Sequence, residues 1–291
     1  MRDPRRLVPV ALVAALLLGG AIGCGPTAGD DTTADGGHDA AAFDGAVDGW
    51  TWPDGANPDA PVGFMGAVYA HGSKQLYKID PDTLDVTLVG TFQWPSGSDE
   101  MTDIALDKDG NMVGISYDTF YAVNKDTAAC TRIAALDRFD FNGLSFIPGE
   151  ELGTGQEILV GAAISGDVYQ IDKSTGNSTR IGNYGGNMSS SGDIVSVRNF
   201  GTVATVKRGI GGNDWLVRID ATTGAATPIG TSDTGVADIW GLGFWKDKVY
   251  GFTDYNEFVL IDIHTGVAQL VKTGDVAWWG AGVTTSAPYI E

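Results

Sequence analysis

The sequence has few of the residues that build metal centres, disulfide scaffolds and nucleic-acid-binding surfaces. Of its 291 residues only 2 are cysteine and 3 are histidine, and 18 basic side chains stand against 37 acidic ones, for a formal net charge of -19. Two cysteines cannot build a disulfide-rich fold, and no His/Cys cluster has the spacing of a zinc site. A chain of this sign lacks the basic surface that displaces counterions from a duplex, so we exclude nucleic acid as a partner.

A long apolar run lies near the N terminus. Leu7 to Gly23 is 17 residues of apolar and small side chains, and the basic residues 1–6 precede it. The run is at the short edge for a membrane span, which needs about 20 apolar residues. A basic head followed by an apolar run is the pattern of a secretory signal, so residues 1–23 are predicted to be a signal peptide.

The end of this run resembles the lipobox of bacterial lipoproteins. It reads Ala21-Ile22-Gly23-Cys24, and Ala21 departs from the usual leucine. The resemblance implies lipidation of the Cys24 thiol, cleavage after Gly23 and N-acylation by a chain such as palmitate; two or more acyl chains anchor a protein stably to a membrane. By the same resemblance, glycine rather than aspartate after Cys24 favours the outer membrane. Ordinary signal cleavage, with Cys24 incidental, and an uncleaved anchor remain as alternatives.

Residues 24–61 form a second compositional zone. They contain eight aspartates, no lysine or arginine, and many glycines and alanines without apolar periodicity. Such a segment cannot bury enough apolar surface to offset the entropy of ordering it, and its like charges keep it extended. We therefore expect a disordered tether between the membrane and a folded domain.

The remaining residues, 62–291, repeat themselves. Each repeat has a β-branched residue, then Asp or Asn, then Thr three positions later, and these Asp/Asn positions are 44, 48, 48 and 42 residues apart. The five copies are Tyr77–Thr83, Tyr121–Thr127, Tyr169–Thr175, Val217–Thr223 and Val259–Thr265. The pattern predicts a strand that ends at the Asp or Asn, a tight turn, and a further outer strand.

Two more strand-like segments precede each copy, one of them short and rich in small residues. Four strands in a unit of about 45 residues are the spacing of a β-propeller blade, in which small residues suit the crowded axis. The pattern resembles NHL, YVTN and WD-like propeller repeats, including the turn Asp107–Asn111. The resemblance covers residues 62–287 and implies a fold, not an activity.

The two ends of the repeat region indicate how the ring closes. The first unit lacks an innermost strand, and Trp278–Val283 near the C terminus matches Trp240–Phe244 at the start of an inner strand. We therefore predict an all-β, five-bladed propeller whose C-terminal strand completes the first blade and removes its exposed edge. We expect this domain to be a monomer.

The residues just before each inner strand are candidates for a site, because propeller ligands usually sit where these loops converge. One column of the repeat alignment is Glu100, Asp140, Ser191, Asp238 and Ala277; the column two residues on is Thr102, Asn142, Asp193, Trp240 and Trp279. An acidic ring of this kind suits a divalent cation such as calcium, and stacking on Trp240, Trp278 or Trp279 suits a cationic or sugar ligand.

Three interpretations of this mouth remain open. The acidic residues are common in turns and the tryptophans fill gaps between blades; or the mouth binds a protein or glycan ligand; or it is catalytic. The last rests on a resemblance to lactonase-like propellers, which implies a metal-dependent hydrolase using Glu100, Asn142, Asp193 and Asp238. We favour an envelope-anchored binding or scaffolding module over an enzyme.

Overall fold

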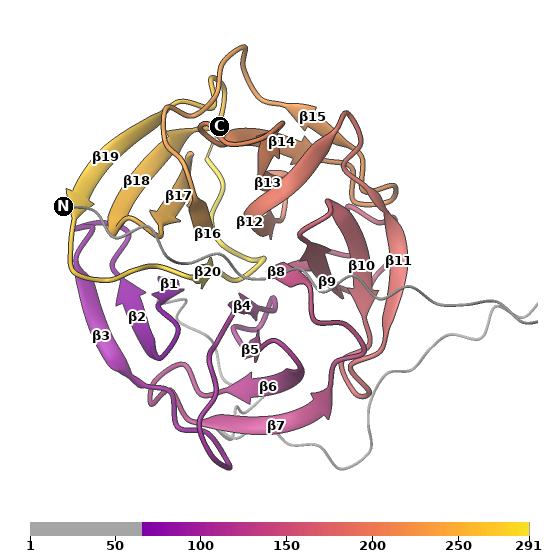
Figure 1. The fold of residues 1–291 in the computed structure, drawn as a ribbon, viewed down its shortest axis with the longest axis vertical. Helices are drawn as coiled ribbons and strands as arrows, with labels where there is room; N and C mark the ends of the chain where they lie inside the picture. Colours follow the sequence, from indigo (N-terminus) through magenta and orange to yellow (C-terminus); the bar gives the residue numbers. More distant parts are fainter. Residues whose placement is uncertain (1–65, 291) are drawn as a thin grey trace, which may run out of the picture. The chain divides into compact units, whose positions relative to one another are not determined.

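The structure, a computed structural model, describes residues 66–290, and there the regular elements are all β-strands. They form five four-stranded antiparallel sheets arranged around a common centre (Figure 1). This is the five-bladed β-propeller that the repeats predict. No helix within residues 66–290 has the length and apolarity to cross a membrane. The predicted signal peptide, Cys24 and the whole of the predicted tether lie outside the described residues.

Each blade has an inner strand, two middle strands and an outer strand. Blade 1 has β20 (Gly280–Gly282), β1 (Val68–His71), β2 (Gln75–Ile79) and β3 (Val86–Thr91). Blade 2 has β4 (Asp103–Leu106), β5 (Met112–Ile115), β6 (Thr119–Val123) and β7 (Cys130–Ala135). Blade 3 has β8 (Phe141–Ile147), β9 (Ile158–Ala163), β10 (Asp167–Ile171) and β11 (Ser178–Asn183). Blade 4 has β12 (Met188–Val197), β13 (Gly201–Arg208), β14 (Trp215–Ile219) and β15 (Ala226–Pro228). Blade 5 has β16 (Ile239–Trp245), β17 (Lys248–Thr253), β18 (Glu257–Asp262) and β19 (Ala268–Thr273).

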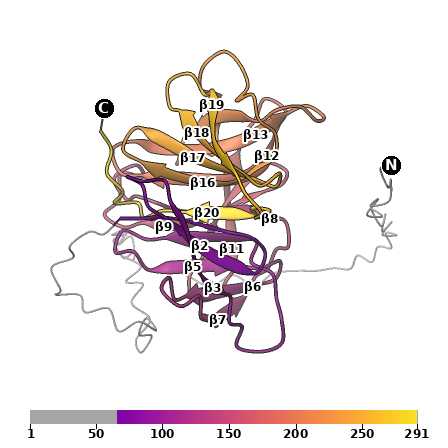
Figure 2. The same ribbon diagram turned by 90° about the vertical axis from the view of Figure 1, so that its left-hand side faces the viewer.

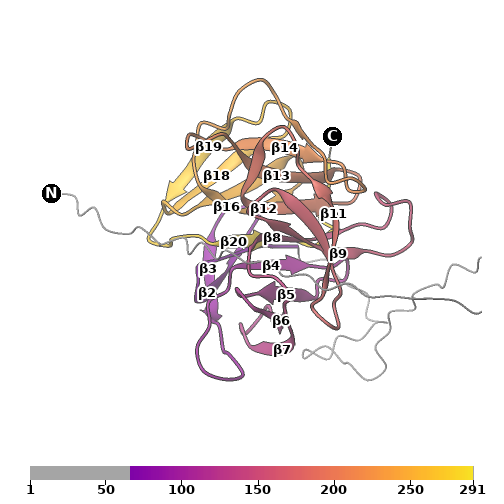
Figure 3. The same ribbon diagram turned by 45° about the vertical axis from the view of Figure 1, so that its right-hand side comes forward.

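The C-terminal strand closes the ring as predicted. β20 pairs antiparallel with β1, with Ala281 opposite Ala70. Figure 2 shows yellow β20 lying among the purple strands from the start of the domain. In Figure 3 the inner strands β4, β8, β12, β16 and β20 gather at the middle of the domain. The first blade therefore holds strands from both ends of the described chain, and β1 is paired on both sides instead of forming an edge.

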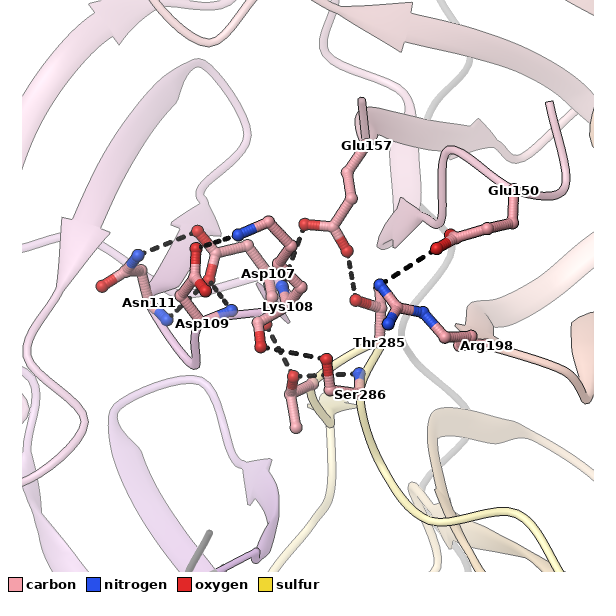
Figure 4. A network of polar contacts seen from close by, with 10 residues as sticks. Asp107, Lys108, Asp109, Asn111, Glu150, Glu157, Arg198, Thr285 and Ser286 are labelled. Atoms are coloured by element: carbon pink, nitrogen blue, oxygen red, sulfur yellow. Dashed lines mark hydrogen bonds and ion pairs between the residues drawn. The ribbon is translucent and has the colours of Figure 1, made fainter. Parts of the chain in front are cut away.

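Side chains that follow β20 fasten this closure to blade 2. Thr284 donates a hydrogen bond to the Asp107 carbonyl at 2.7 Å, and Ser286 donates to the Lys108 carbonyl at 3.0 Å. Thr285 donates to the Glu157 carboxylate of blade 3 (Figure 4). The C-terminal segment thus ties blades 1, 2 and 3 together on one side of the ring.

The turn after β4 belongs to this network. Its residues Asp107, Asp109 and Asn111 have the spacing of the first three ligands of an EF-hand calcium loop. One oxygen of the Asp107 carboxylate accepts the Asp109 and Asn111 backbone N–H groups at 3.0 and 2.8 Å. The other accepts the Asn111 side-chain amide at 2.9 Å (Figure 4). The Asp107 carboxylate therefore stabilises the turn, and this role accounts for the residue types at positions 107 and 111 without a metal ion.

The repeated Asp/Asn and Thr positions build the same turn in all five blades. In blade 3 the Asp172 carboxylate accepts the backbone N–H groups of Ser174 and Thr175 at 2.9 and 2.8 Å, and the Thr175 hydroxyl accepts that of Asn177. The Ser174 hydroxyl also donates to the Asp172 carboxylate. This hydrogen bond, followed by those of the backbone N–H groups, lowers the pKa of Asp172 to about 2. The equivalent residues are Asp80, Asn124, Asp220 and Asp262. The motif therefore encodes an Asx turn.

Successive turns of an antiparallel meander alternate between the two ends of its strands. The Asx turns and the turns after the inner strands lie at one end, which we call the turn face. The connections from one blade to the next, and those between the two middle strands, lie at the opposite end, which we call the mouth face. The inner strands begin at the mouth face, so residues just before them converge there.

Candidate functional site

A pocket of about 370 Å³ lies at the mouth face. Its lining comes from the first residues of inner strands, from the segments just before them and from loops between middle strands. It comprises Thr102, Tyr117, Phe139, Phe141, Asn142, Ile164, Ser190, Ser191, Gly192, Trp240 and Trp279. All five blades contribute, from Trp279 of blade 1 to Trp240 of blade 5. The pocket is therefore centred on the propeller axis and not in a cleft between two blades.

Five residues of the two predicted columns meet in this pocket: Thr102, Asn142, Ser191, Trp240 and Trp279. Asn142, Trp240 and Trp279 line it and are each partly exposed. Trp278, in contrast, is buried beside blades 1 and 5, where its ring lies 5.2 Å from those of Tyr77 and Phe252. For Trp278 the structure shows the gap-filling role that the sequence left open.

The strand register moves Asp193 to a different level of the axis. Ile194 of β12 pairs with Ala204, just as Leu144 of β8 pairs with Gly161. The residue level with Asn142 is therefore Gly192, so the repeat alignment was one residue out in blade 4. A serine flanked by apolar residues occurs in both inner strands, at positions that differ by one, and this similarity misled the alignment.

With the register corrected, Asp193 lies level with Asp103, one layer below the pocket. Both residues are fully buried, and glycines occupy the same level in the other three blades: Gly143, Gly241 and Gly280. The Asp193 carboxyl accepts the N–H groups of Ile194 and Leu242 at 2.6 and 2.7 Å, and Asp103 accepts that of Ile104 at 2.8 Å. The two carboxyls therefore satisfy backbone groups of the converging inner strands.

Burial and mutual contact decide the protonation of this pair. Burial, followed by the charge of Asp193 and a hydrogen bond with it, raises the pKa of Asp103 well above its usual range. Burial also raises the pKa of Asp193. The second Asp103 oxygen meets no hydrogen-bond donor, so it is the natural position for a proton donated to Asp193. Two adjacent buried carboxyls are stable when they share a proton.

His71 completes the buried polar layer. Its Nδ1 lies 3.0 Å from the Gly72 carbonyl, and since a carbonyl only accepts, Nδ1 carries the ring proton. Nε2 then faces Asp103 Oδ1 at 3.8 Å. Burial lowers the pKa of His71 to about 4, so the ring is neutral at physiological pH.

The two other predicted acidic residues lie apart from the axis. The Asp238 carboxylate forms an ion pair with Lys207 at 3.0 Å, and Lys207 also contacts the buried Asp214 at 2.6 Å. Glu100 is half-buried before β4; burial, and then the charge of Glu100, raises the pKa of Tyr117 at the pocket rim.

The hydrolase hypothesis needs Glu100, Asn142, Asp193 and Asp238 to act as one donor set. Asp193 instead binds backbone amides below the pocket, and Asp238 binds a lysine. Across residues 66–290, no three His, Cys, Asp or Glu side chains lie close enough together to hold a metal ion. The geometry of the mouth therefore gives the metal hypothesis no support.

Several lining residues were missed by the sequence analysis. Tyr117, Phe139 and Ile164 stand at the rim with 52%, 70% and 58% of their surface exposed, and Phe141 is buried beside them. In the sequence, Tyr117, Phe139 and Ile164 are apolar or aromatic residues in loops, at positions where the five repeats have no residue in common. Such singly exposed side chains carry no meaning until the fold brings them to one opening.

Comparisons with known proteins add little to this description. No protein-family model and no curated protein matches the chain. Among solved structures, a protein of unknown function from Bacteroides caccae aligns with a TM-score of 0.41 and 8% identity, over 71% of this chain and 72% of that one. The computationally designed Ika8 protein aligns with a TM-score of 0.35 and 17% identity, over 73% and 60%. Likenesses this distant carry no argument, so the function has to be argued from the site.

Proposed function

We propose that the protein is a binding module of the cell envelope that takes an uncharged carbohydrate at the mouth of its propeller. The observation that carries this proposal is the composition of the pocket. Its apolar lining is mostly aromatic, and every polar side chain that lines it is uncharged. A sugar ring offers apolar C–H faces that stack on aromatic rings, and hydroxyls that need neutral hydrogen-bonding partners.

The charges near the mouth support an uncharged ligand over a cation. Asp238 is paired with Lys207, and the Asp193 carboxyl faces backbone amides one layer below. No carboxylate lines the pocket to compensate a cation. A charged ligand would lose its hydration without a partner of opposite sign, which is unfavourable in a partly enclosed site.

A glycan array tests the proposal. The purified full chain is applied in lauryldimethylamine oxide, a detergent without a sugar headgroup, and compared with Trp240→Ala and Trp279→Ala. We expect both variants to lose at least tenfold in affinity for the glycans that the wild-type chain binds. Tyr255→Ala is the matched control, because Tyr255 is 64% exposed in a loop of the same face and does not line the pocket. Unchanged binding by both tryptophan variants would exclude this site.

The place of action is proposed from the sequence alone. The lipobox-like ending at Cys24 and the acidic residues 24–61 support a lipid anchor and a tether, with the domain held clear of the membrane. Fractionation of cells that express wild-type chain or Cys24→Ala tests this. We expect the wild-type chain in outer-membrane fractions and the variant in soluble ones; identical distribution would contradict the anchor.

A further inference from the structure

The pocket at the mouth has a closed floor. Directly beneath it the inner strands approach one another so closely that side chains do not fit between them. A Cβ placed on Gly143 would lie 2.8 Å from the Gly192 carbonyl oxygen, and one on Gly241 would lie 2.6 Å from the Gly280 carbonyl carbon. Real Cβ atoms do not come this near to backbone atoms, so the glycines are required there.

The centre of this layer is filled as well. The Asp103 and Asp193 side chains occupy the axis and have no solvent-exposed surface. Three of their four oxygens accept backbone N–H groups, one from each of the inner strands β4, β12 and β16. No passage runs from the pocket through the ring, so a ligand must enter and leave by the mouth face.

The walls surround the pocket on all sides. Trp279 and Trp240 come from blades 1 and 5, Tyr117 and Ile164 from blades 2 and 3, and Ser191 from blade 4. A groove across the mouth would leave one or more blades out of the lining, and a polymer could then lie along it. A pit of about 370 Å³ that all five blades border, near the lower end of small-ligand pockets, holds a unit about the size of one or two sugar rings.

The side-chain amide of Asn142 lies at the base of this pit. The Asn142 Oδ1 atom is buried and accepts no hydrogen bond, and its Nδ2 reaches the Ser190 carbonyl only at 3.5 Å. A buried acceptor without a donor is unfavourable, and rotation of the partly exposed Asn142 amide about χ2 would present Oδ1 to a ligand hydroxyl in the pit. The amide is uncharged, which matches a sugar hydroxyl rather than a carboxylate or phosphate.

Resting on the proposed carbohydrate function, we propose that the pocket reads the end of a neutral glycan chain. The terminal sugar enters the pit along the propeller axis, stacks on the Trp240 and Trp279 walls and donates a hydroxyl to Asn142. The remainder of the chain leaves past the exposed rim of Tyr117, Phe139 and Ile164. Internal sugars of a chain, which have a neighbour on both sides, cannot reach the floor.

Titration calorimetry with oligosaccharides of defined length tests this inference. The full chain in lauryldimethylamine oxide is titrated with malto-, cello-, manno- and N-acetylchito-oligosaccharides of one to six units. For the series that binds, we expect affinity to rise from one unit to two or three and then stay constant, because further units lie outside the pit. Affinity that continues to rise up to six units would overturn end recognition and indicate a groove.

Blocked ends provide the second arm. Each binding oligomer is also titrated with its reducing end reduced to the alditol, and with its non-reducing end acetalised at O4 and O6. We expect one of these changes to lower affinity at least tenfold and the other to have little effect. Equal binding of both blocked forms would overturn the inference while leaving the carbohydrate function intact. Absence of binding to every series and to the glycan array would instead defeat the proposed function itself.

Variants of the pit floor complete the test. Asn142→Ala and Asn142→Ser should each lower affinity for the unblocked oligomer at least fivefold, and the control Tyr255→Ala should not. Circular dichroism and the melting temperature of each variant establish that it is folded. Folded Asn142 variants that bind as tightly as wild type would remove Asn142 from the contact and overturn the assigned geometry.

Discussion

The turn face and the mouth face of the propeller differ in how alike their residues are from blade to blade. On the turn face, five Asx turns repeat one hydrogen-bonding scheme, and the turn between β4 and β5 and the segment after β20 are fastened through their own polar groups. On the mouth face the five blades place different residues at one level: Thr102, Asn142, Gly192, Trp240 and Trp279. The Asx turns satisfy their own backbone N–H groups, whereas the Asn142 oxygen at the mouth has no hydrogen-bond donor.

This difference separates residues that hold the ring together from residues that are free to bind. Repetition is expected where the same strand has to end in the same way five times. Departure from the repeat is expected where the five blades together face one asymmetric ligand. Stability should therefore depend on the turn face and the axis, and binding on the mouth. Four predictions test this division, in order of the effect expected.

The largest effect is expected at the axis. Asp193→Ala leaves the buried N–H groups of Ile194 and Leu242 without an acceptor. Each buried unsatisfied group costs about 1–3 kcal/mol, so we expect the free energy of unfolding to fall by about 3–5 kcal/mol. Guanidinium chloride denaturation measures the loss. Asp172→Ala, which removes an acceptor from an exposed turn, is the control, and we expect it to lower the free energy of unfolding by about 1 kcal/mol. Equal losses would contradict a structural role for the axial carboxyl pair.

The second prediction concerns a turn glycine. Gly176 has a φ of +71°, and its added Cβ would collide with the Ala135 carbonyl oxygen of the neighbouring blade. Gly176→Ala is therefore expected to cost about 2 kcal/mol or more, from left-handed strain plus the collision. Gly153→Ala, with a φ of +65° and open space around it, isolates the strain at about 1 kcal/mol. Denaturant midpoints that agree for the two variants would contradict close blade packing at this turn.

The fold was predictable from the sequence because the strands and turns inferred in one repeat can be compared with those of the other four. The Asp80 turn and its four equivalents use the same residue types for the same hydrogen bonds, so blade number and strand order follow from spacing. Closure by β20 was predictable because Trp279-Gly280 repeats Trp240-Gly241. Each of these inferences depends on similarity between blades, which a sequence displays directly.

The site was only partly predictable because it depends on differences between blades. Asn142, Trp240 and Trp279 were identified by their position before inner strands. Asp193 was misplaced because Ser196 of β12 was aligned with Ser145 of β8, although the strand register places the two serines one residue apart. The rim residue Phe139 lies in a loop without a counterpart in the repeat, so only the folded ring reveals its place.

The third prediction follows from the titration of the axial pair. Burial raises the pKa of Asp193 to about 8. A raised pKa means that the folded chain binds the proton more tightly, so the stability this proton contributes is complete below the unfolded pKa of about 3.9 and is lost progressively as pH rises to about 8. We expect Asp193 to lower the free energy of unfolding as pH rises from about 4 to about 8, by about 1.4 kcal/mol per pH unit at most, and to add no further pH dependence above about 9.

Asp193→Asn gives the control for this pH dependence. The variant has no titrating group at that position, so its melting temperature should lack the decline that Asp193 gives the wild-type chain between about pH 4 and 8. Differential scanning calorimetry at matched ionic strength measures both curves. Wild-type and variant curves that run parallel over this range would show that folding does not raise the pKa of the axial pair.

The smallest effects give the closest comparison of the two faces, because each offers an asparagine. On the turn face the Asn124 side chain accepts the N–H groups of Asp126 and Thr127 at 2.9 and 3.0 Å. Asn124→Ala should therefore cost about 1 kcal/mol. At the mouth, Asn142 Oδ1 has no donor and Nδ2 makes one long contact, so Asn142→Ala should change the free energy of unfolding by less than about 0.5 kcal/mol. Urea denaturation of both variants decides: an Asn142 loss as large as that of Asn124 would mean that the mouth amide is a structural group, whereas a negligible loss is the result expected of a residue whose partner is a ligand and not the chain.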